Sequence, residues 1–218
     1  MDFRWDLIWR SLPLLLQGAW LTIQLTSISV FFGILVGTIA GMLRLSKGPM
    51  RYLAGAYVDF IRGTPLLVQI FIIYYGFPAL IQNPVPPYVA AIIALSLNCG
   101  AYVAEIVRSG IQSIEKGQTE AALSLGLTPN KTMRYIILPQ AFRRIIPPLG
   151  NEFIALLKDS SLVSVIALEE LVRRAQVIIG RTFRPFELWL AVALIFLVMT
   201  FTISRLVNYV ERRLKVGD

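Results

Sequence analysis

The sequence predicts an all-α protein that crosses a membrane several times. Hydrophobic residues make up 56% of the 218 residues, and the mean hydropathy of +0.67 is too high for an ordinary soluble domain. Two stretches, 11–43 and 63–104, contain no charged residue. Each is longer than the roughly 20 apolar residues that a helix needs to cross the hydrocarbon core. No run of alternating polarity indicates a barrel, so we expect a polytopic helical protein.

Five segments are expected to cross the membrane within a single transmembrane domain that covers 1–218. The segment 82–87 (Gln-Asn-Pro-Val-Pro-Pro) interrupts the second uncharged stretch and separates two crossings. Gly33, Gly37 and Gly41 recur at four-residue spacing in the first crossing, which predicts close packing against another helix. The expected spans are 12–43, 53–81, 88–107, 145–168 and 186–207.

Basic residues are distributed unevenly between the two sides of this arrangement. Thirteen of the 21 lie on the side that holds the loops after the first and third spans and the C-terminal tail, and six lie on the other side. Because the side richer in Lys and Arg is usually cytoplasmic, we expect the N-terminus outside and the C-terminus in the cytoplasm. The loop 109–144 is then cytoplasmic. The net charge of +8 is accounted for by lipid and topology rather than by nucleic acid.

No pattern in the sequence is typical of an enzyme. There is no G-x-x-x-x-G-K-[ST] phosphate loop, no histidine, and a single cysteine, Cys99. Cysteines and carboxylates do not occur at the spacing of metal ligands. Tyr102 and Glu105 could form an acid/base pair, but nothing near them would activate a nucleophile. We therefore expect no catalytic site, metal or other cofactor in this chain.

The cytoplasmic loop contains a predicted helical hairpin. A short helix over 120–126 ends at Gly126, and Thr128 caps a second helix with Pro129 at its first position. Two short helices joined by a glycine turn form a compact projection to which another protein can bind.

Ionisable residues inside membrane spans are costly and indicate functional sites. Glu152 and Asp159 are seven residues apart and share one face of the fourth span. Asn98, Tyr102 and Glu105 form a similar stripe on the third. The remaining ionisable residues predicted within spans are Asp59 and Arg62, which we expect to pair with each other at i, i+3, and Lys158, which we expect to meet another helix.

The second span is interrupted at Gly63-Thr64-Pro65, because Pro65 removes a helical hydrogen bond and Gly63 relaxes the backbone. A simple proline kink is one interpretation. The other is a binding site, since interrupted helices near mid-membrane recur where transporters bind substrate and their positive ends suit an anionic group.

Three segments together resemble the permeases of polar amino acid ABC importers. They are 60–69, 105–139 and 151–162. The second contains the pattern E-A-A, three residues, G, nine residues, I-x-L-P, which starts at Glu120. The resemblance implies a type I importer permease fold in the bacterial cytoplasmic membrane. It also implies a second permease subunit, two cytoplasmic ATPase subunits that carry ATP and Mg²⁺, and an external amino-acid-binding protein. The coupling residues it implies are Glu120, Ala121, Ala122, Leu125 and Gly126.

The systems resembled import arginine, histidine, lysine or glutamine. We predict a basic amino acid, with Glu152 and Asp159 facing its cationic groups. The carboxylate end would meet backbone groups near Gly63, Thr64 and Leu67, and Asn98. Tyr102 and Ser161 complete the predicted substrate-binding set. Import of glutamine or another neutral polar amino acid remains an alternative, as do a secondary transporter, a channel and a non-transporting scaffold. A second copy of this chain is favoured over a different partner permease.

Overall fold

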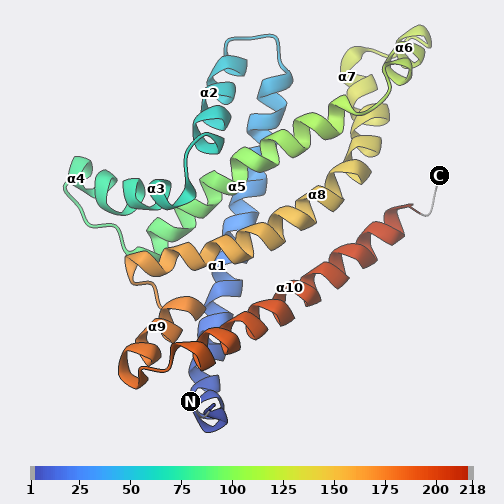
Figure 1. The fold of residues 1–218 in the computed structure, drawn as a ribbon. Coiled ribbons are helices and arrows are strands. Elements are labelled where there is room, and N and C mark those ends of the chain that lie inside the picture. Colours follow the sequence, from blue (N-terminus) through green and yellow to red (C-terminus); the bar gives the residue numbers. More distant parts are fainter. Residues whose placement is uncertain (1–2, 216–218) are drawn as a thin grey trace.

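The computed structural model describes residues 3–215, and every regular element in that range is a helix (Figure 1). Two π-helical turns, η1 and η2, each join a pair of α-helices into one continuous helical stretch. The elements are α1 (Trp5–Leu45), α2 (Met50–Arg62), α3 (Leu66–Phe71), η1 (Ile72–Gly76), α4 (Phe77–Ile81), α5 (Pro87–Gln112), α6 (Lys116–Ser124), α7 (Pro129–Thr132), η2 (Met133–Ile137), α8 (Leu138–Asp159), η3 (Ser160–Ile166), α9 (Leu171–Thr182) and α10 (Pro185–Lys215).

Three helices, α1, α5 and α10, are long and apolar enough to cross a membrane. The pair α2 and α3–α4 makes a fourth candidate, bent by 106° at the break between Arg62 and Leu66. With its 41 residues, α1 is about 60 Å long, roughly twice the thickness of the hydrocarbon core. It therefore tilts or extends beyond the bilayer.

The fourth expected span, 145–168, is helical up to Ile166 but is not a single α-helix. The α-helix begins earlier, ends at Asp159, and continues as the 3-10 helix η3 up to Ile166. The hydroxyl of Ser160 donates to the carbonyl of Leu157 at 2.8 Å. Serine side chains compete in this way with the backbone bonds of a helix. Ala167 then closes η3 in a left-handed conformation, with φ of 60°. The count of five spans is thus not confirmed by helix length and composition.

Close packing of α1 against α5 confirms the interpretation of the glycine stripe. A Cβ on Gly37 would lie 2.5 Å from both the carbonyl oxygen of Gly100 and the Cβ of Val103, and a Cβ on Gly33 would lie 2.7 Å from Cys99. Such distances require displacement of a neighbouring helix. The glycines therefore allow the backbones of α1 and α5 to approach closely.

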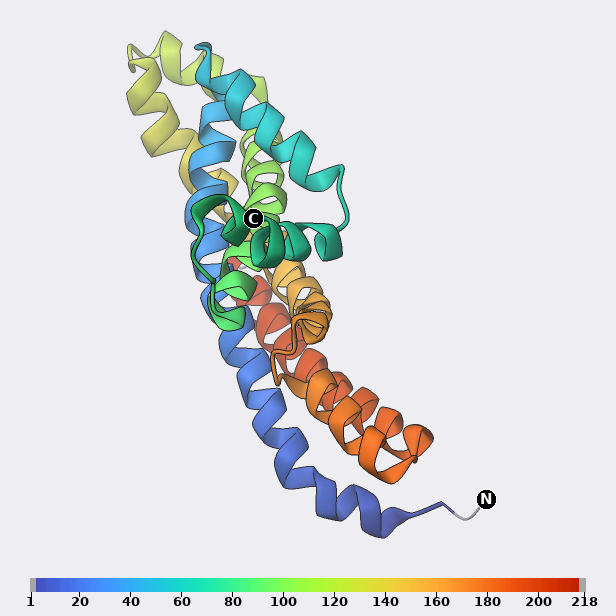
Figure 2. The same ribbon diagram turned by 90° about the vertical axis from the view of Figure 1, so that its left-hand side faces the viewer.

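A buried carboxylate caps the start of α9, and the first backbone N–H of α9 is hydrogen-bonded to α1. Glu170 accepts hydrogen bonds from the backbone N–H groups of Val172 at 2.9 Å and Arg173 at 2.7 Å, which caps α9. Burial raises the pKa of the Glu170 carboxyl to about 7, although both N–H groups favour its ionised form. The N–H of Leu171 donates to the Thr22 hydroxyl of α1 at 3.3 Å. Figures 1 and 2 show α9 and the N-terminal part of α1 at the end of the molecule opposite α6 and α7.

Candidate functional site

The break between α2 and α3 is a sharp turn with its own hydrogen bonds. The N–H of Gly63 donates to the carbonyl of Asp59 at 2.9 Å, and the Thr64 hydroxyl donates to the carbonyl of Phe60 at 2.9 Å. A Cβ on Gly63 would lie 2.8 Å from the Asp59 oxygen, so this turn requires a glycine. Pro65 then starts α3 in a new direction. The chain therefore does more than kink here, because it turns by 106°.

A buried glutamine holds the two sides of this break together. The side-chain amide of Gln69 donates to the carbonyls of Ile61 at 2.7 Å and Thr64 at 3.0 Å, and to the Thr64 hydroxyl at 3.0 Å. Its oxygen accepts a hydrogen bond from the Asn98 amide of α5 at 3.0 Å. The chain Asn98–Gln69–Ile61 thus ties the end of α2 to the middle of α5. We call it the amide clamp.

The amide clamp changes the interpretation of Asn98 and adds a residue that was not predicted. Asn98 is buried, and its NH₂ group donates one hydrogen bond to Gln69, so it has a structural role whether or not it also binds a substrate, which stays a prediction. Gln69 had one signal in the sequence, since it is the only amide in the apolar segment 66–81. A polar side chain in such a segment needs a hydrogen-bond partner.

Glu105 is the centre of a charged cluster beside the break. Its carboxylate forms a salt bridge with Arg44 of α1, another with Arg108 at 2.7 Å, and a longer one with Arg62 at 3.9 Å. The cluster links the ends of α1, α2 and α5. Glu105 is therefore engaged by three arginines.

The predicted pairing of Asp59 with Arg62 is wrong. Asp59 lies 3.8 Å from Arg44, and Arg62 contacts Glu105 and lies over the ring of Tyr102, 5.3 Å from its centroid. The reason is that α5 offers Arg62 both a carboxylate and an aromatic face, whereas a pair within α2 would be exposed. Tyr102 is consequently part of a cation–π contact in this chain.

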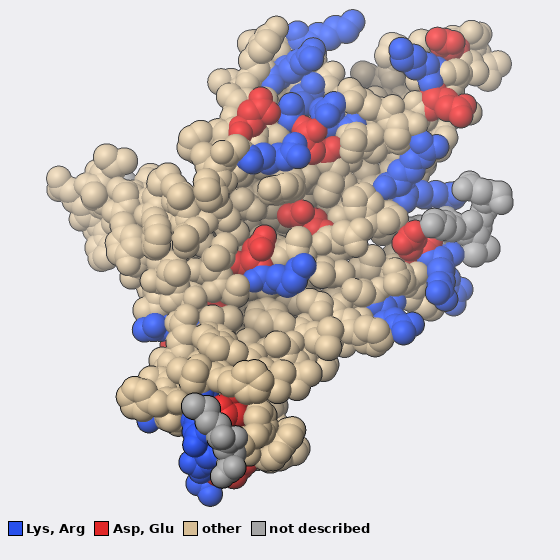
Figure 3. All heavy atoms as spheres, in the orientation of Figure 1, with Lys and Arg blue, Asp and Glu red and all other residues tan. Residues whose placement is uncertain are grey.

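Glu152 and Asp159 lie on α8, away from the arginine cluster. Glu152 is half-buried, Asp159 is exposed, and within residues 3–215 neither forms a salt bridge. The charges of Asp159 and Arg62 both act on the Glu152 carboxyl, so the end of α2 is within electrostatic range of it. Figure 3 shows acidic groups in the middle of a largely uncharged face, with a basic side chain beside one of them. The charge of Lys158 acts on the Asp159 carboxyl. Lys158, expected to meet another helix, is exposed.

The remaining predicted substrate residues lie on elements that pack together. Leu67 is on α3 and Ser161 is on η3, and both side chains are half-buried. The element α3 contacts η3 as well as α5. The predicted set thus gathers around the broken helix, although the assignment of these side chains to a substrate stays a prediction.

The predicted hairpin is present, with the expected caps. Gly126 has φ of +82°. The N–H of Leu127 donates to the carbonyl of Ala122 at 3.1 Å, and the N–H of Gly126 donates to that of Leu123 at 2.9 Å. These two bonds define a Schellman motif. Thr128 caps the second helix by accepting a hydrogen bond from the N–H of Lys131 at 3.4 Å.

The hairpin presents apolar side chains at its tip. Leu125 is 85% exposed, and Leu123 and Tyr135 are also exposed. Ala121 is exposed, whereas Ala122 is buried by this chain and does not face outward. Exposed leucines on a projecting hairpin are typical of a protein-docking surface. The coupling assignment itself stays a prediction.

Comparison with known proteins shows the family. The sequence profile described as "Binding-protein-dependent transport system inner membrane component" matches residues 33–216. The chain is 41% identical to the glutamine transport system permease protein GlnP of Escherichia coli, over 99% of this chain and 100% of that one. From Bacillus subtilis, the L-cystine permease TcyB is 46% identical, over 96% and 91% of the two chains. The arginine permease ArtQ is 38% identical, over 95% of each.

A solved structure has the same fold over almost the whole chain. A crystal structure of an amino acid ABC transporter with histidines superposes with a TM-score of 0.93 at 43% identity, over 98% of this chain and 100% of that one. The all-helical architecture, the apolar spans and the sequence matches agree. The chain therefore belongs to the binding-protein-dependent transport system inner membrane components, as a multi-pass bacterial permease subunit of an amino acid ABC importer.

Proposed function

We propose that this permease imports a polar amino acid, with a basic one as the favoured substrate. The observation that carries the proposal is the pair Glu152 and Asp159, two carboxylates without a salt bridge in the described chain, one of them half-buried. Arg44, Arg62 and Arg108 form their salt bridges with Glu105 rather than with this pair. The charges of Arg62 and Lys158 still act on Glu152 and Asp159, but neither carboxylate has a basic partner at salt-bridge distance among the described residues. A cationic substrate would offset a charge that is otherwise costly in a dehydrated site.

The carboxylate end of such a substrate would lie near the broken helix. Leu66 opens α3, and the backbone N–H groups of its first turn point toward the break, where they favour an anionic group. Leu67 and Thr64 lie there. Asn98 fixes this backbone through the amide clamp, and its second N–H is the group that would meet the substrate carboxylate.

Neutral polar substrates are the second candidate. The relatives are described as permeases for glutamine, cystine and arginine, which spans neutral and basic substrates at similar identity. In that case Glu152 would serve a hydrogen-bonded rather than an ionic contact.

We propose that the two ends of the molecule lie on opposite sides of the membrane and bind different partners. The hairpin within 109–144 docks on a cytoplasmic ATPase dimer, which binds ATP and Mg²⁺, through Glu120, Ala121, Leu125 and Gly126. The opposite end, with α9 and an external N-terminus, meets an extracellular or periplasmic amino-acid-binding protein. Five crossings result if α8 with η3 spans the bilayer as the fourth. A second copy of this chain completes the pathway.

The test is ATP-driven uptake by the reconstituted complex. Proteoliposomes that contain the permease, its ATPase and its binding protein are assayed with labelled arginine and labelled glutamine, for the native chain and for Glu152→Gln. Removing one partner of a desolvated charge pair costs about 2–5 kcal/mol, or roughly 30-fold or more in affinity. We expect a loss of this size in the apparent affinity for arginine and a much smaller change for any glutamine transport.

Glu169→Gln is the matched control, because Glu169 is an exposed carboxylate two residues before α9. Since the binding protein is proposed to dock at this end, the control is read as the ratio of arginine to glutamine uptake, which should be unchanged. Transport of glutamine but not arginine by the native complex, or undiminished arginine affinity in Glu152→Gln, would establish the neutral candidate instead.

A further inference from the structure

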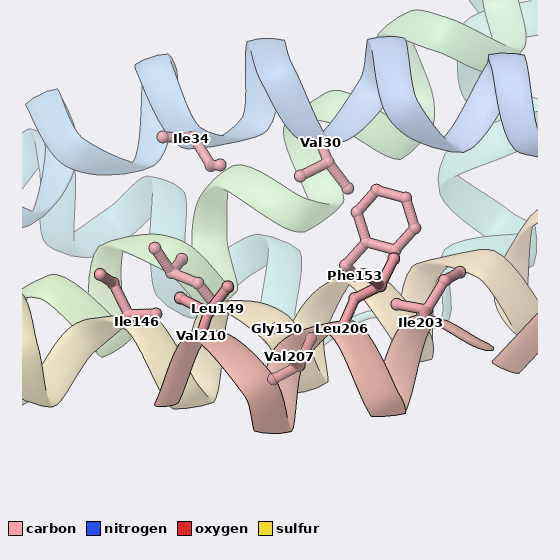
Figure 4. Close-up of a pocket in the computed structure, with 10 residues that line it drawn as sticks. All are labelled: Val30, Ile34, Ile146, Leu149, Gly150, Phe153, Ile203, Leu206, Val207 and Val210. Atoms are coloured by element: carbon pink, nitrogen blue, oxygen red, sulfur yellow. The ribbon is translucent and has the colours of Figure 1, made fainter. Parts of the chain in front are cut away.

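An apolar groove of about 410 Å³ runs between α1, α8 and α10. Figure 4 shows its residues converging from the three helices, with the ring of Phe153 at one end. The helices α8 and α10 touch at Gly150, where a Cβ would lie 2.4 Å from Val207, so the floor of the groove is tightly closed. The groove is lined by Val30, Ile34, Ile146, Leu149, Gly150, Phe153, Ile203, Leu206, Val207 and Val210.

The two helices that form the floor run antiparallel. In Figure 4, Ile146 of α8 lies at the same end as Val210 of α10, and Phe153 lies at the same end as Ile203. The lining runs from Ile146 to Phe153 along α8, a length of about 10 Å. The groove therefore has two distinct ends, one beside Ile146 and Val210 and the other beside Phe153 and Ile203.

One end of the groove is basic on both helices. Arg143 lies three residues before Ile146, and Arg213 lies three residues after Val210, so each is one helical turn beyond the apolar lining. Both are exposed, as is Arg212. Neither Arg143 nor Arg213 forms a salt bridge within residues 3–215. Arg213 donates to the Tyr209 hydroxyl at 3.1 and 3.3 Å and lies over that ring, 5.4 Å from its centroid, so its positive charge is not neutralised.

The other charged groups around this end do not cancel its positive charge. Arg144 donates to the carbonyl of Ser113 at 2.6 Å and adds a further positive charge. Glu211 is the acidic residue among these positions on α10 and is half-buried. The exposed ring of Tyr209 at the same level is typical of the interface between membrane and water.

We propose that this groove binds an anionic phospholipid of the surrounding bilayer. One acyl chain lies along the apolar lining, and the headgroup phosphate meets Arg143 and Arg213. The apolar lining suits an acyl chain, because a hydrocarbon needs no hydrogen-bonding group. The basic end suits an anionic headgroup, because clustered arginines between transmembrane helices attract such groups. The bound lipid would fasten α8, which follows the hairpin, to α10.

The experiment uses photoreactive lipids on the assembled complex in vesicles. Phosphatidylglycerol and phosphatidylcholine with the same diazirine-bearing acyl chain are cross-linked separately, and the labelled peptides are identified. Each arginine near an anionic headgroup contributes about fivefold in affinity. We expect phosphatidylglycerol to label 146–153 and 203–210 at least fivefold more than phosphatidylcholine does. Arg143→Gln with Arg213→Gln should remove this preference.

Two matched controls separate the groove from general effects. Arg10→Gln with Arg181→Gln removes the same charge at the far end of the molecule and should leave labelling unchanged. Leu206→Trp fills the groove and should abolish labelling, whereas Leu197→Trp should not, because Leu197 is equally exposed at 61% on α10 but lies outside the lining.

Three results would overturn the proposal. These are equal labelling by the two lipids, labelling in the Arg143→Gln and Arg213→Gln double variant that still prefers phosphatidylglycerol, and an absence of lipid adducts from the groove. If adducts are absent while Leu206→Cys forms disulfide-linked dimers within the native complex, the occupant is a second copy of this chain. Assembly with the ATPase, measured by gel filtration, shows that each variant is folded.

Discussion

The chain contains two helix–break–helix units that are built on different principles. At the hairpin, α6 ends at Ser124, and the chain turns at Gly126 through hydrogen bonds within six residues. A Cβ at that glycine would meet nothing within 4 Å. At the second break, α2 ends at Arg62 and the chain turns at Gly63, and Gln69 and Asn98 hold this turn from 6 and 35 positions further along the sequence. The first turn is local and exposed, and the second depends on tertiary contacts.

The difference matches the mechanical tasks that we propose for the two regions. A coupling hairpin must present a fixed shape to another protein, and a Schellman turn keeps that shape without support from the rest of the chain. A pathway element must hold its backbone at a set position relative to α5, which requires a side chain that reaches across. Four predictions test this contrast between a local turn and a clamped one.

The largest effect is expected from Gly126→Val. The left-handed conformation at φ of +82° costs a β-branched residue about 1–2 kcal/mol or more. The hairpin would shift to another turn and lose its docking shape. Uptake by the reconstituted complex should fall at least tenfold, while binding of substrate to the external binding protein is unaffected.

Gly126→Asn is the decisive comparison for that variant. Asparagine tolerates the left-handed region, and its Cβ has the same open space as that of valine. We expect it to retain most of the uptake. If both variants lose activity equally, the requirement is for a small side chain at the ATPase surface rather than for the backbone conformation.

A smaller effect, on stability, is expected from Gln69→Leu. The substitution leaves the carbonyl of Ile61 and the amide of Asn98 without their partner in a buried site, which costs about 1–3 kcal/mol. Thermal unfolding of the purified complex in detergent should begin at a lower temperature. Ser96→Ala is the control on α5, because the buried Ser96 hydroxyl has no hydrogen-bond partner within the described chain and its loss should be neutral.

Asn98→Leu tests whether the clamp acts as one unit. The single variant should destabilise the complex, but the double variant Gln69→Leu with Asn98→Leu should be little worse than Gln69→Leu alone, since the pair is already broken. Additive effects would show that Asn98 contributes through another contact, such as a substrate.

The same contrast explains what could be predicted from the sequence. The caps at Gly126 and Thr128 were predictable, because each depends on residue types within a few positions. The glycine stripe of α1 was predictable for the same reason. The partner of Arg62 was not, because its choice between Asp59 and Glu105 depends on how α2 packs against α5. The end of α8 at Asp159 was missed because apolar residues continue through η3, and hydropathy does not separate an α-helix from a 3-10 helix.

The position of the candidate site could be predicted from the sequence, but the hydrogen-bond partners of its residues could not. Residues 63–67 and the carboxylates of α8 stand out as a glycine–proline break and as charges in apolar sequence. The role of Gln69 required the structure, since its partners lie on two other segments. The contact of Asn98 with Gln69 also required the structure, and direct binding of a substrate by Asn98 stays a prediction.

The smallest effect is expected from Thr128→Ala, which removes the side-chain cap of the second hairpin helix. Loss of an N-cap costs about 0.5–2 kcal/mol, and the bond to the Lys131 N–H is long at 3.4 Å, so the lower part of that range applies. Because the hairpin is local, the loss should remain local. Hydrogen exchange should quicken by about two- to fivefold over 129–137, with no change at α5 and no shift in the unfolding temperature of the complex. Thr128→Ser keeps the acceptor and should exchange as the native chain does. Faster exchange that spreads to α5, or a lower unfolding temperature, would show that the hairpin is coupled to the packed helices and would remove the distinction between the two breaks.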